Sequence, residues 1–476
     1  MSSTHLLLGA ARVTAPMERD VRDPWTREAF AVAPWADASH AERAVVIASA
    51  AFPRTKALST YVRRDVCLGV ARVLRERREA LATTIAREVG KPIGLARIEV
   101  ERAAGTFAIA ADVATRPVGE VVPLDLGVAH ARHAGSYVRV PKGPVLAFSP
   151  FNFPLNLVAH KVAPALACGA PVVLKPAPKA PLTALALAEI VREAGAPAGA
   201  FTVVPCDDAV AERLVRDERF AVLSFTGSAK VGYMLKALAG KKHVVLELGG
   251  NAAAIVHDDV HDASFAADAV TTSAFAYAGQ VCISTQRVYV HHARYEAFVA
   301  ELVTRAAKLT PEEPVSAAGI LGPVVDEGAA SRITTWIGEA EARGAVVLHR
   351  GARDENRMGT VVLREPEDTR GLRVVEEEAF GPVVTVCPYA TLDEAFAKVN
   401  ASRYGLQAAI FTDSTRVIDA AYATLDVGGL VVNDSPSFRS DAMPYGGTKD
   451  SGLGREGVAF AVNEYTAPKV KVVRAG

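Results

Sequence analysis

The chain has 476 residues; half are hydrophobic, 22% are charged, and 53 Lys and Arg residues balance 53 Asp and Glu residues. This length allows two or three domains with a substantial core, and the composition is that of a folded globular protein rather than a disordered one. The zero net charge gives no electrostatic reason to expect binding to nucleic acid or to an anionic membrane surface.

The five cysteines lie far apart, at positions 67, 168, 206, 282 and 387. None has Cys-x-x-Cys spacing and no His/Cys cluster suggests zinc, so we expect no metal site. The sparse, odd number fits a reducing compartment, and the N-terminus lacks a secretory signal pattern. The most apolar region, residues 144–174, contains Lys161 and several other breaks, which excludes a bilayer span. We therefore expect a cytoplasmic protein without membrane contact.

Residues 39–115 are predicted to be helical, because apolar residues recur three and four positions apart. From Pro117 to Val140, turn residues separate short β-rich runs and predict a long projecting hairpin. The tail, residues 467–473, alternates apolar and charged side chains. It is predicted to be a strand that needs a partner, with the hairpin of another subunit as the candidate.

Between residues 144 and 250, apolar strands alternate with amphipathic segments of helical length, which predicts a parallel sheet covered on both faces. The predicted strands are residues 145–148, 172–174, 201–204, 222–225 and 244–247. Ligands bind such sheets at the carboxyl ends of the strands. Polar landmarks lie at four of these ends: Asn152, Lys175, Thr226-Gly-Ser228 and Glu247. We expect them to converge on one edge.

A second α/β unit is predicted over residues 251–451, with strands at 287–290, 383–386, 408–411 and 429–432. Cys282 belongs to this unit, so an active site would lie between two domains. A thiolate can attack a carbonyl, and a carboxylate such as Glu247 can then activate water against the thioester. The alternative is a buried cysteine and a helix-capping glutamate.

Seven motifs in order over some 300 residues identify a resemblance to the NAD(P)-dependent aldehyde dehydrogenase superfamily, extending from near Asp23 to the C-terminus. They are Pro150-Phe-Asn-Phe-Pro154, Lys175-Pro-Ala177, Phe225-Thr-Gly-Ser228, Glu247-Leu-Gly-Gly250, Gly279-Gln-Val-Cys282, Glu377-Glu-Ala-Phe-Gly-Pro382, and Pro444-Tyr-Gly-Gly447 through Ser451-Gly-Leu-Gly-Arg-Glu456. The resemblance implies an α/β fold with a Rossmann-like parallel-sheet NAD(P)-binding domain (1–116 and 139–250) and an α/β catalytic domain (251–451). It also implies a small β oligomerisation arm (117–138 and 460–476). We expect a homodimer or homotetramer, since an isolated hairpin is marginal in water.

The resemblance implies oxidation of an aldehyde to the free acid. Cys282 matches the nucleophile that forms a thiohemiacetal and then a thioester, and Asn152 matches the side-chain donor to the oxyanion. Glu247 matches the general base for hydrolysis, which favours an acid over a coenzyme A thioester. An alternative role for Asn152 is to cap the helix that follows the first strand.

The family's cofactor positions are also matched. Phe225, Gly227 and Ser228 open a helix whose free N–H groups attract a pyrophosphate, although an ordinary strand–helix turn is the alternative. Lys175 matches the lysine on the adenine ribose, Glu378 the glutamate on the nicotinamide ribose, and Phe380 the aromatic residue beside it. For Glu378 the alternative is a solvated turn residue. Lys161 and Glu456 match polar positions near a proton route, or form a structural ion pair.

Two positions depart from the family pattern. Pro178 and then Lys179 stand where many members have a carboxylate that repels a 2′-phosphate, so NAD or NADP is expected as cofactor. Tyr277 replaces a common asparagine.

The substrate side is matched by Phe151, Phe153, Asn156, His160, Val281, Ile283, Phe438 and Arg439. The loop from Asn433 to Arg439 looks like that of bacterial lactaldehyde, semialdehyde and phosphonate- or sulfonate-aldehyde dehydrogenases. Arg439 and His160 could meet an anionic group on a short aldehyde. The alternative is that Arg439 ties down its loop through Asp434 or Asp441.

Two further functions remain open at the level of sequence. Cys282 and Glu247 alone would also suit a cofactor-independent thiol hydrolase, and the fold could belong to a catalytically silent protein. The first leaves Lys175, Gly227 and Glu378 without a purpose, and the second does not explain Cys282, Glu247 and Asn152 together.

Overall fold

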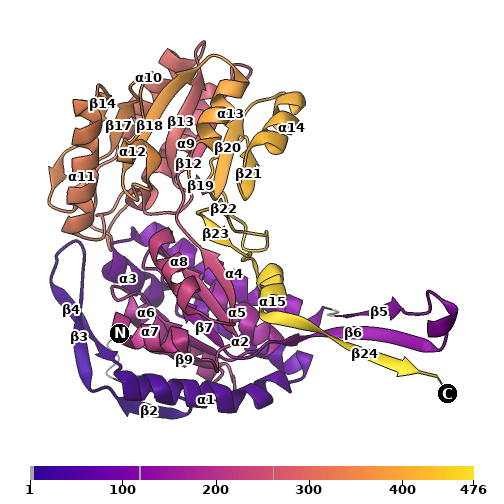
Figure 1. Cartoon of the computed structure of the whole chain (residues 1–476). Helices are drawn as coiled ribbons and strands as arrows, with labels where there is room; N and C mark the ends of the chain where they lie inside the picture. The colour runs from indigo at the N-terminus through magenta and orange to yellow at the C-terminus, as the bar shows by residue number, and fades with distance from the viewer. Residues whose placement is uncertain (1–4, 117–118, 261, 476) are drawn as a thin grey trace.

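The computed structural model describes residues 5–116, 119–260 and 262–475. Two α/β layers lie one above the other, and a long β arm extends from the lower one (Figure 1). This confirms the predicted fold class. The predicted domain limits include residues 1–4, 117–118, 261 and 476, which lie outside the described residues, and the division into domains stays a prediction.

The lower layer is built on a six-stranded sheet in the order β23-β11-β10-β7-β8-β9. Its strands are β7 (Val145–Phe148), β8 (Val172–Lys175), β9 (Phe201–Val203), β10 (Val222–Thr226), β11 (His243–Glu247) and β23 (Gly452–Leu453). The five predicted strands are confirmed and are parallel, whereas β23 runs antiparallel to β11. The chain moves outward from β7 to β9 and then returns to β10 on the other side of β7, which creates a crevice at the carboxyl ends of β7 and β10.

The register of these strands aligns their carboxyl ends. Phe148 pairs with Lys175 on one side of β7 and with Phe225 on the other. Thr226, the next residue of β10, pairs with Glu247 of β11. Lys175, Thr226 and Glu247 therefore end their strands at the same edge of the sheet, as the sequence predicts.

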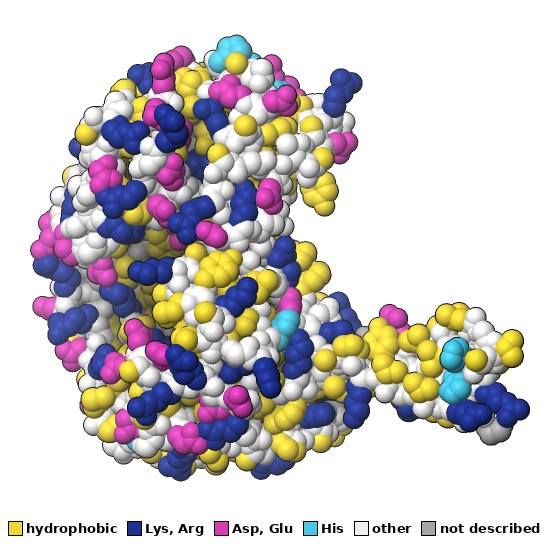
Figure 2. Space-filling view, in the orientation of Figure 1, with side chains coloured by type: hydrophobic (Ala, Val, Ile, Leu, Met, Phe, Trp, Pro, Cys, Tyr) yellow, Lys and Arg dark blue, Asp and Glu magenta, His cyan; other side chains and the backbone are white. Residues whose placement is uncertain are grey.

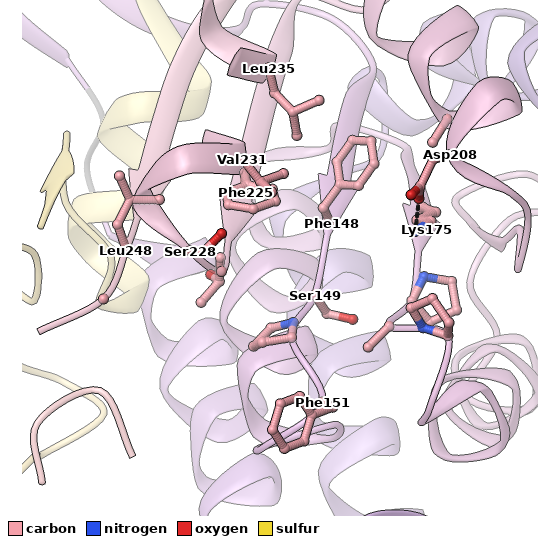
Figure 3. Close-up of a pocket in the computed structure, with 18 of the residues that line it drawn as sticks. Phe148, Ser149, Phe151, Lys175, Asp208, Phe225, Ser228, Val231, Leu235 and Leu248 are labelled. Carbon is pink, nitrogen blue, oxygen red and sulfur yellow. Dashed lines mark hydrogen bonds and ion pairs between the residues drawn. The ribbon is translucent and has the colours of Figure 1, made fainter. Parts of the chain in front are cut away.

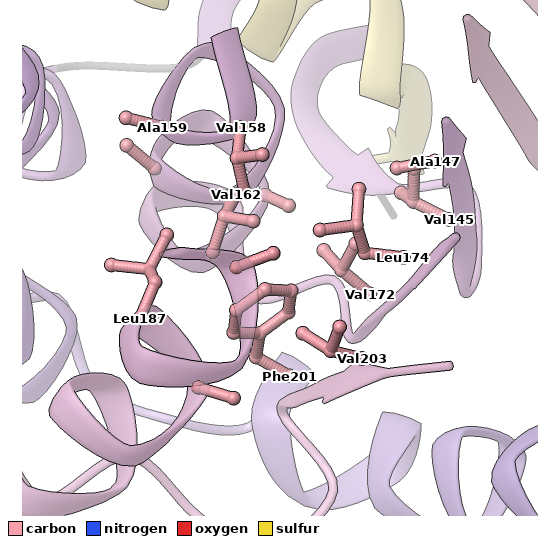
Figure 4. Packing of buried hydrophobic residues seen from close by; sticks show 14 of the residues in the cluster. Val145, Ala147, Val158, Ala159, Val162, Val172, Leu174, Leu187, Phe201 and Val203 are labelled. Carbon is pink, nitrogen blue, oxygen red and sulfur yellow. The ribbon is translucent and has the colours of Figure 1, made fainter. Parts of the chain in front are cut away.

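Helices cover both faces of this sheet. Four of them, α1 (Ala38–Lys56), α2 (Thr60–Glu76), α3 (Arg78–Val89) and α4 (Ile93–Thr115), confirm the helical prediction for residues 39–115. The remaining ones are α5 (Asn156–Cys168), α6 (Pro181–Glu193), α7 (Asp208–Arg216), α8 (Ala229–Leu238) and α15 (Val458–Tyr465). Every residue of α5 is buried. Figure 4 shows its residues Val158 and Val162 facing apolar side chains of β7, β8 and β9.

The N-terminal region contains strands that the sequence did not predict. They form two antiparallel hairpins, β1 (His5–Leu8) with β2 (Ala11–Thr14), and β3 (Met17–Arg22) with β4 (Ala29–Trp35). Most side chains of β2 and β3 are exposed and polar, so these strands lack the apolar runs by which the inner strands were recognised.

The upper layer is built on a seven-stranded sheet in the order β14-β17-β18-β13-β12-β20-β21. Its strands are β12 (Ala252–Val256), β13 (Thr285–His291), β14 (Val346–Arg350), β17 (Val361–Arg364), β18 (Val383–Tyr389), β20 (Gln407–Phe411) and β21 (Gly429–Val432). The four predicted strands are confirmed, and β12, β14 and β17 were not predicted. Its helices are α9 (Ala263–Phe275), α10 (Tyr295–Ala306), α11 (Glu327–Ala342), α12 (Arg373–Glu376), α13 (Leu392–Asn400) and α14 (Thr415–Thr424).

Several short elements lie in the connections between the longer ones. They are the single-turn helices η1 (Val128–His130) and η2 (Ala276–Gly279), and the two-residue strands β15 (Arg353–Asp354), β16 (Arg357–Met358), β19 (Tyr404–Gly405) and β22 (Thr448–Lys449). None of the helices in the described part of the chain combines the length and apolarity needed to cross a bilayer.

The arm consists of β5 (Gly119–Pro123), β6 (His133–Pro141) and β24 (Thr466–Arg474) in the order β24-β6-β5. The predicted strand in the tail is present, but the expectation that it pairs with the hairpin of another subunit is wrong. It runs antiparallel along β6 of its own chain, from Thr466 opposite Pro141 to Arg474 opposite His133. Helix α15 brings the tail to the base of the arm, so the intrachain strand is within reach.

A buried carboxylate fixes the start of α6. Ala180 precedes this helix and has no polar side chain to cap it, and the helix begins with Pro181. Glu88 of α3 supplies the acceptor instead: it receives the N–H of Leu182 at 2.5 Å, the N–H of Thr183 at 3.1 Å, and the hydroxyl of Thr183. Because the loop after β8 leads directly into α6, this contact also positions that loop.

We predict that Glu88→Ala lowers the free energy of unfolding by about 3 kcal/mol, because three buried donors lose their acceptor. Denaturant unfolding followed by circular dichroism measures this change. Glu76→Ala is the matched control. It removes an exposed helix pair with Arg72, and it is expected to change stability by less than about 0.5 kcal/mol. Equal stability of the two variants would contradict the capping role.

Candidate functional site

A cavity of about 1060 Å³ lies at the carboxyl ends of the lower sheet and receives residues from both layers. Nine residues singled out from the sequence line it: Phe151, Asn152, Lys175, Phe225, Gly227, Ser228, Cys282, Glu378 and Phe380. Figure 3 shows Phe148, Phe225 and Leu235 along its wall and the Lys175–Asp208 ion pair at one side. The sequence did not predict several of its residues, among them Asp208, Glu212, Val231, Met234, Leu248 and Arg332.

The turn between β10 and α8 has the shape needed for a close approach by a ligand. A Cβ atom at Gly227 would lie 2.6 Å from the Phe225 ring, and one at Gly232 would lie 2.4 Å from Leu248. Ser228 precedes α8 without making a side-chain capping bond. The first turn of α8 therefore keeps N–H groups for an external acceptor. This glycine-lined helix start at the cavity wall fits a dinucleotide pyrophosphate.

Lys175 and Lys179 have different positions in the structure. Lys175 lines the cavity and its Nζ lies 3.3 Å from Oδ1 of Asp208. Lys179 faces a neighbouring pocket, where its Nζ lies 2.5 Å from Oδ2 of Asp326. Asp326 thus holds the positive charge of Lys179 in the neighbouring pocket. Pro178 does line the cavity.

Glu378 is held at the junction of the two layers. Its Oε1 accepts the N–H of Gly250 at 3.1 Å, and a Cβ atom at Gly249 would lie 2.3 Å from its Oε2. Burial raises the pKa of Glu378 to about 7, although Arg332 acts in the opposite direction. The alternative of a solvated turn residue is wrong. Phe380 lies beside it at the cavity, and its ring contacts that of Phe151 edge to face, with centroids 5.8 Å apart.

The backbone before Cys282 is strained. Tyr277, Ala278 and Gly279 have φ angles of 53°, 54° and 67°, a left-handed conformation that costs energy for the first two residues. Tyr277 is anchored by its hydroxyl, which donates to the carbonyl of Val89 at 2.9 Å. A Cβ atom at Gly250 would lie 2.2 Å from the carbonyl oxygen of Cys282. Gly250 therefore permits the Cys282 backbone to pack against it.

Cys282 is half-buried among apolar side chains that include Ile283 and Leu406. Its Sγ lies 3.0 Å from the hydroxyl oxygen of Tyr445. Burial raises the pKa of the thiol to about 11, whereas the hydrogen bond with Tyr445 acts to lower it. A buried, largely protonated thiol needs stabilisation of its thiolate before it can act as a nucleophile.

Asn152 lies next to the segment that carries Cys282. Its Nδ2 donates to the carbonyl of Gln280 at 2.8 Å. The alternative in which Asn152 caps the following helix is wrong, because Glu99 accepts the N–H groups of Leu155 and Asn156 at 2.9 and 3.1 Å. An amide nitrogen has two N–H donors, so one remains for another acceptor.

Glu247 is buried, and neither carboxyl oxygen has a hydrogen-bond partner among the described residues. Burial, followed by the nearby negative charge of Glu456, raises its pKa well above the ordinary value. A Cβ atom at Gly446 would lie 2.9 Å from its Oε1. Glu247 itself is not part of the cavity wall, although its neighbours Leu248 and Gly249 are.

A network of buried charges lies behind Cys282 and Glu247. Glu456 accepts Lys161 Nζ at 3.0 Å and Arg439 Nη2 at 3.3 Å. Burial opposes ionisation of Glu456, but Lys161 and Arg439 hold its pKa at about 2. The guanidinium of Arg439 stacks on the Tyr445 ring, 3.7 Å from the centroid. The network thus leads from Lys161 to the residue that contacts the Cys282 sulfur.

The remaining substrate candidates differ in position. Nε2 of His160 lies 2.8 Å from Oδ1 of Asp441, and Arg102 forms two hydrogen bonds with the same carboxylate. The alternative in which Arg439 pairs with Asp434 or Asp441 is therefore wrong, since Glu456 is its partner. Phe438 is 51% exposed. Others are fixed by the protein itself: Asn156 donates to Asp441, Phe153 lies under the ammonium of Lys91, and Val281 and Ile283 flank Cys282.

One group of potential metal ligands lies elsewhere. His257, Asp258 and Asp259 present ligand atoms within 4.8 Å of one another. Their atoms already have protein partners, since His257 contacts Tyr389 and Asp258, and Asp259 accepts the hydroxyl of Thr412. This group is outside the cavity and takes no part in the arrangement around Cys282.

Comparison with known proteins gives consistent results along almost the whole chain. Residues 13–471 match the model of the aldehyde dehydrogenase family. The chain is 40% identical over 461 residues to 3-sulfolactaldehyde dehydrogenase of Priestia aryabhattai, which covers 97% of this chain and 96% of that protein.

Two solved structures are similar in fold. Aldehyde dehydrogenase 21 from Physcomitrella patens, in complex with the reaction product succinate, has a TM-score of 0.97 and 40% identity, with coverage of 99% of this chain and 98% of that one. The NADP-dependent glyceraldehyde-3-phosphate dehydrogenase of Bacillus halodurans C-125, complexed with NADP, has a TM-score of 0.96 and 32% identity and covers both chains completely.

Proposed function

Because this chain belongs to the aldehyde dehydrogenase family and is an NAD(P)-dependent aldehyde dehydrogenase, we propose that it releases a free carboxylic acid through covalent catalysis at Cys282. The observation that carries this proposal is the shared cavity: the Cys282 thiol lines the same space as the glycine-lined start of α8. A nucleophile and a dinucleotide site in one cavity fit the oxidation of a carbonyl. A cofactor-independent thiol hydrolase or a catalytically silent protein would have no use for the dinucleotide site.

In the proposed first step, the Cys282 sulfur attacks the aldehyde carbon and forms a thiohemiacetal. The free N–H of Asn152 and the backbone N–H of Cys282 donate to the developing oxyanion. Such a donor contributes about 3 kcal/mol in the transition state. A bound NAD or NADP would accept the two electrons and the hydrogen released from that carbon. Lys175, Ser228 and Glu378 would hold the cofactor, with Phe225, Gly227 and Phe380 forming its contact surface.

Glu247 is proposed to act in the second step, in which water hydrolyses the thioester. Its carboxyl oxygens are buried and have no hydrogen-bond partner among the described residues, so neither is committed to another group. Its raised pKa makes it a stronger base once it is ionised. The charges of Arg439, Lys161 and Arg455 favour that ionised form.

We propose a short aldehyde with an anionic group as the substrate. Arg439 lies two contacts from the Cys282 sulfur, through Tyr445. Its Nε is buried without a partner among the described residues. Such a donor suits a carboxylate or sulfonate oxygen. The relatives support this choice, since one is named for 3-sulfolactaldehyde and another binds succinate as its product.

We propose that NADP is accepted at least as well as NAD. Pro178 lines the cavity and brings no carboxylate against a 2′-phosphate. The carboxylate of Asp208, which also lines the cavity, is paired with Lys175. A solved relative is NADP-dependent and complexed with NADP. Lys175 places a positive charge on this side of the cavity.

We propose that the arm of β5, β6 and β24 mediates a homodimer or homotetramer. Its exposed side chains include five apolar ones, Val121, Leu126, Val128, Val470 and Val472, which in β24 alternate with exposed lysines. Figure 2 shows this hydrophobic surface along the projecting arm. Such a surface on a slender arm is typical of a protein interface. We also propose that the protein is located in the cytoplasm.

We predict that Cys282→Ala abolishes aldehyde oxidation while cofactor binding, measured by calorimetry, stays nearly intact. Glu247→Gln should instead accumulate acyl-enzyme, visible by intact mass after a single turnover, because deacylation loses its base. Cys387→Ala is the matched control, since Cys387 lies in β18 away from the cavity. Turnover by the Cys282→Ala variant would refute the mechanism.

For the substrate, we predict that anionic short aldehydes give higher kcat/KM than uncharged ones of equal length.

For cofactor choice, we predict that Pro178→Glu lowers kcat/KM with NADP at least tenfold and changes the value with NAD much less. Two like charges about 4 Å apart at a protein surface repel by roughly 4 kcal/mol before screening. Pro16→Glu, in the exposed turn after β2, is the control. A wild type that favours NAD a thousandfold, or an unchanged preference in the variant, would disprove control by this position.

For assembly, we predict that removal of residues 467–476 converts the oligomer to smaller species in sedimentation, because β6 loses its neighbour. Val470→Asp with Val472→Asp should weaken assembly while leaving the strand in place. Val346→Asp, at an exposed position of β14, should leave assembly unchanged. A monomeric intact chain would overturn the assignment of the arm.

A further inference from the structure

The loop between β21 and α15 brings a tyrosine hydroxyl to the nucleophilic sulfur. Tyr445 Oη lies 3.0 Å from Cys282 Sγ. The position of Tyr445 is fixed by two backbone hydrogen bonds with Glu456: its N–H donates to the Glu456 carbonyl at 3.1 Å, and the Glu456 N–H donates back at 2.7 Å. The ring is buried. Its hydroxyl is therefore a rigid neighbour of the sulfur.

The direction of this hydrogen bond depends on the state of the thiol. When Cys282 carries its proton, either atom can donate. When the thiol ionises, the S–H bond breaks, the proton goes to solvent and the electron pair stays on sulfur. The phenol is then the one possible donor of the pair. A hydrogen bond from a neutral donor to an anion is stronger than one between neutral groups, so this contact favours the thiolate.

The charges around the pair act in different directions. Glu378 and Glu247 face the sulfur and disfavour a second negative charge, whereas Arg439 favours it. The same Arg439 and Glu247 face the phenol. Burial and the neighbouring Cys282 raise the pKa of Tyr445 well above its ordinary value, although Arg439 opposes this. The raised pKa favours the protonated form of the phenol, which is the form that can donate.

We propose that Tyr445 is a positioning residue for the nucleophile, which donates its hydroxyl hydrogen to the Cys282 thiolate and holds the sulfur in place. This inference rests on the proposed role of Cys282 and adds a residue to it. Arg439, stacked on the ring, places its positive charge beside the phenol and strengthens the donor. The alternative is that Tyr445 only fills the apolar cluster with Ile283 and Leu406.

Alkylation of Cys282 by iodoacetamide at a series of pH values separates these two roles, because the thiolate is the reacting species. Labelling is followed by peptide mass mapping on the full-length protein without aldehyde or cofactor. Tyr445→Phe keeps the ring and deletes the hydroxyl. We expect alkylation to be about tenfold slower at each pH below the thiol pKa, which corresponds to a rise of about one unit. The gap should close at pH values above both pKa values.

Tyr233→Phe is the matched control. It deletes a partly buried hydroxyl that donates to the carbonyl of Lys449 at 3.0 Å, away from the sulfur, and its alkylation profile should overlay that of the wild type. Overlap of the Tyr445→Phe profile with the wild type would overturn the proposal and leave Tyr445 as a packing residue.

A second measurement does not use Tyr445→Phe, in case that variant does not fold. Ultraviolet difference spectra between wild type and Cys282→Ser report the thiolate and any tyrosinate during titration. We expect the thiolate signal to appear without a tyrosinate signal; tyrosinate formation at or below the same pH would overturn the donor assignment. Neither measurement requires turnover. A failure of the proposed function, seen as oxidation by Cys282→Ala, is therefore distinguishable from a failure of this inference.

Discussion

The rest of the site depends on the ion pairs that the buried carboxylate of Glu456 forms. It joins Lys161 of α5 to Arg439 of the loop after β21, and its own backbone pairs with Tyr445. Loss of one partner from a buried ion pair costs about 3–5 kcal/mol, because an uncompensated charge remains. The loop that carries Arg439 and Tyr445 is thus locked to the most buried helix of the lower layer. The sulfur of Cys282, which belongs to the upper layer, contacts Tyr445 of that loop.

Close backbone approach is the second constraint, and it explains the glycines at the centre of the molecule. Gly249 gives room to the carboxylate of Glu378, and Gly250 to the carbonyl of Cys282. On the other side of the cavity, Gly227 and Gly232 allow Phe225 and Leu248 to pack against the start of α8. A side chain at any of these positions would push apart groups from different elements. Gly249 and Gly250 therefore set how closely the two layers meet, and Gly227 and Gly232 set the packing at the start of α8.

The sequence predicted the features that depend on local pattern. The apolar runs of the lower sheet located its strands, and the parallel arrangement then aligned Lys175, Thr226 and Glu247 at one edge. It missed β12, whose first three residues are alanines, and the N-terminal hairpins, whose strands β2 and β3 are mostly exposed. The sequence also did not predict the partners of the charged residues. Arg439 pairs with Glu456 rather than with Asp434 or Asp441, which are nearer to it in the sequence. His160 shares Asp441 with Arg102. Such choices depend on which side chains the fold brings together.

Tyr445 illustrates the same limit within a motif that the sequence did identify, since the motif shows a tyrosine but not the sulfur beside it. The charges in this region also impose an order on the chemistry. Cys282 and Glu247 both have raised pKa values, and each disfavours ionisation of the other. A protonated Glu247 permits a thiolate beside it. In the mechanism proposed for this site, the acylated sulfur carries no charge, and the carboxyl can then lose its proton to become a base. That mechanism needs only one region with limited capacity for negative charge for both its nucleophile and its general base.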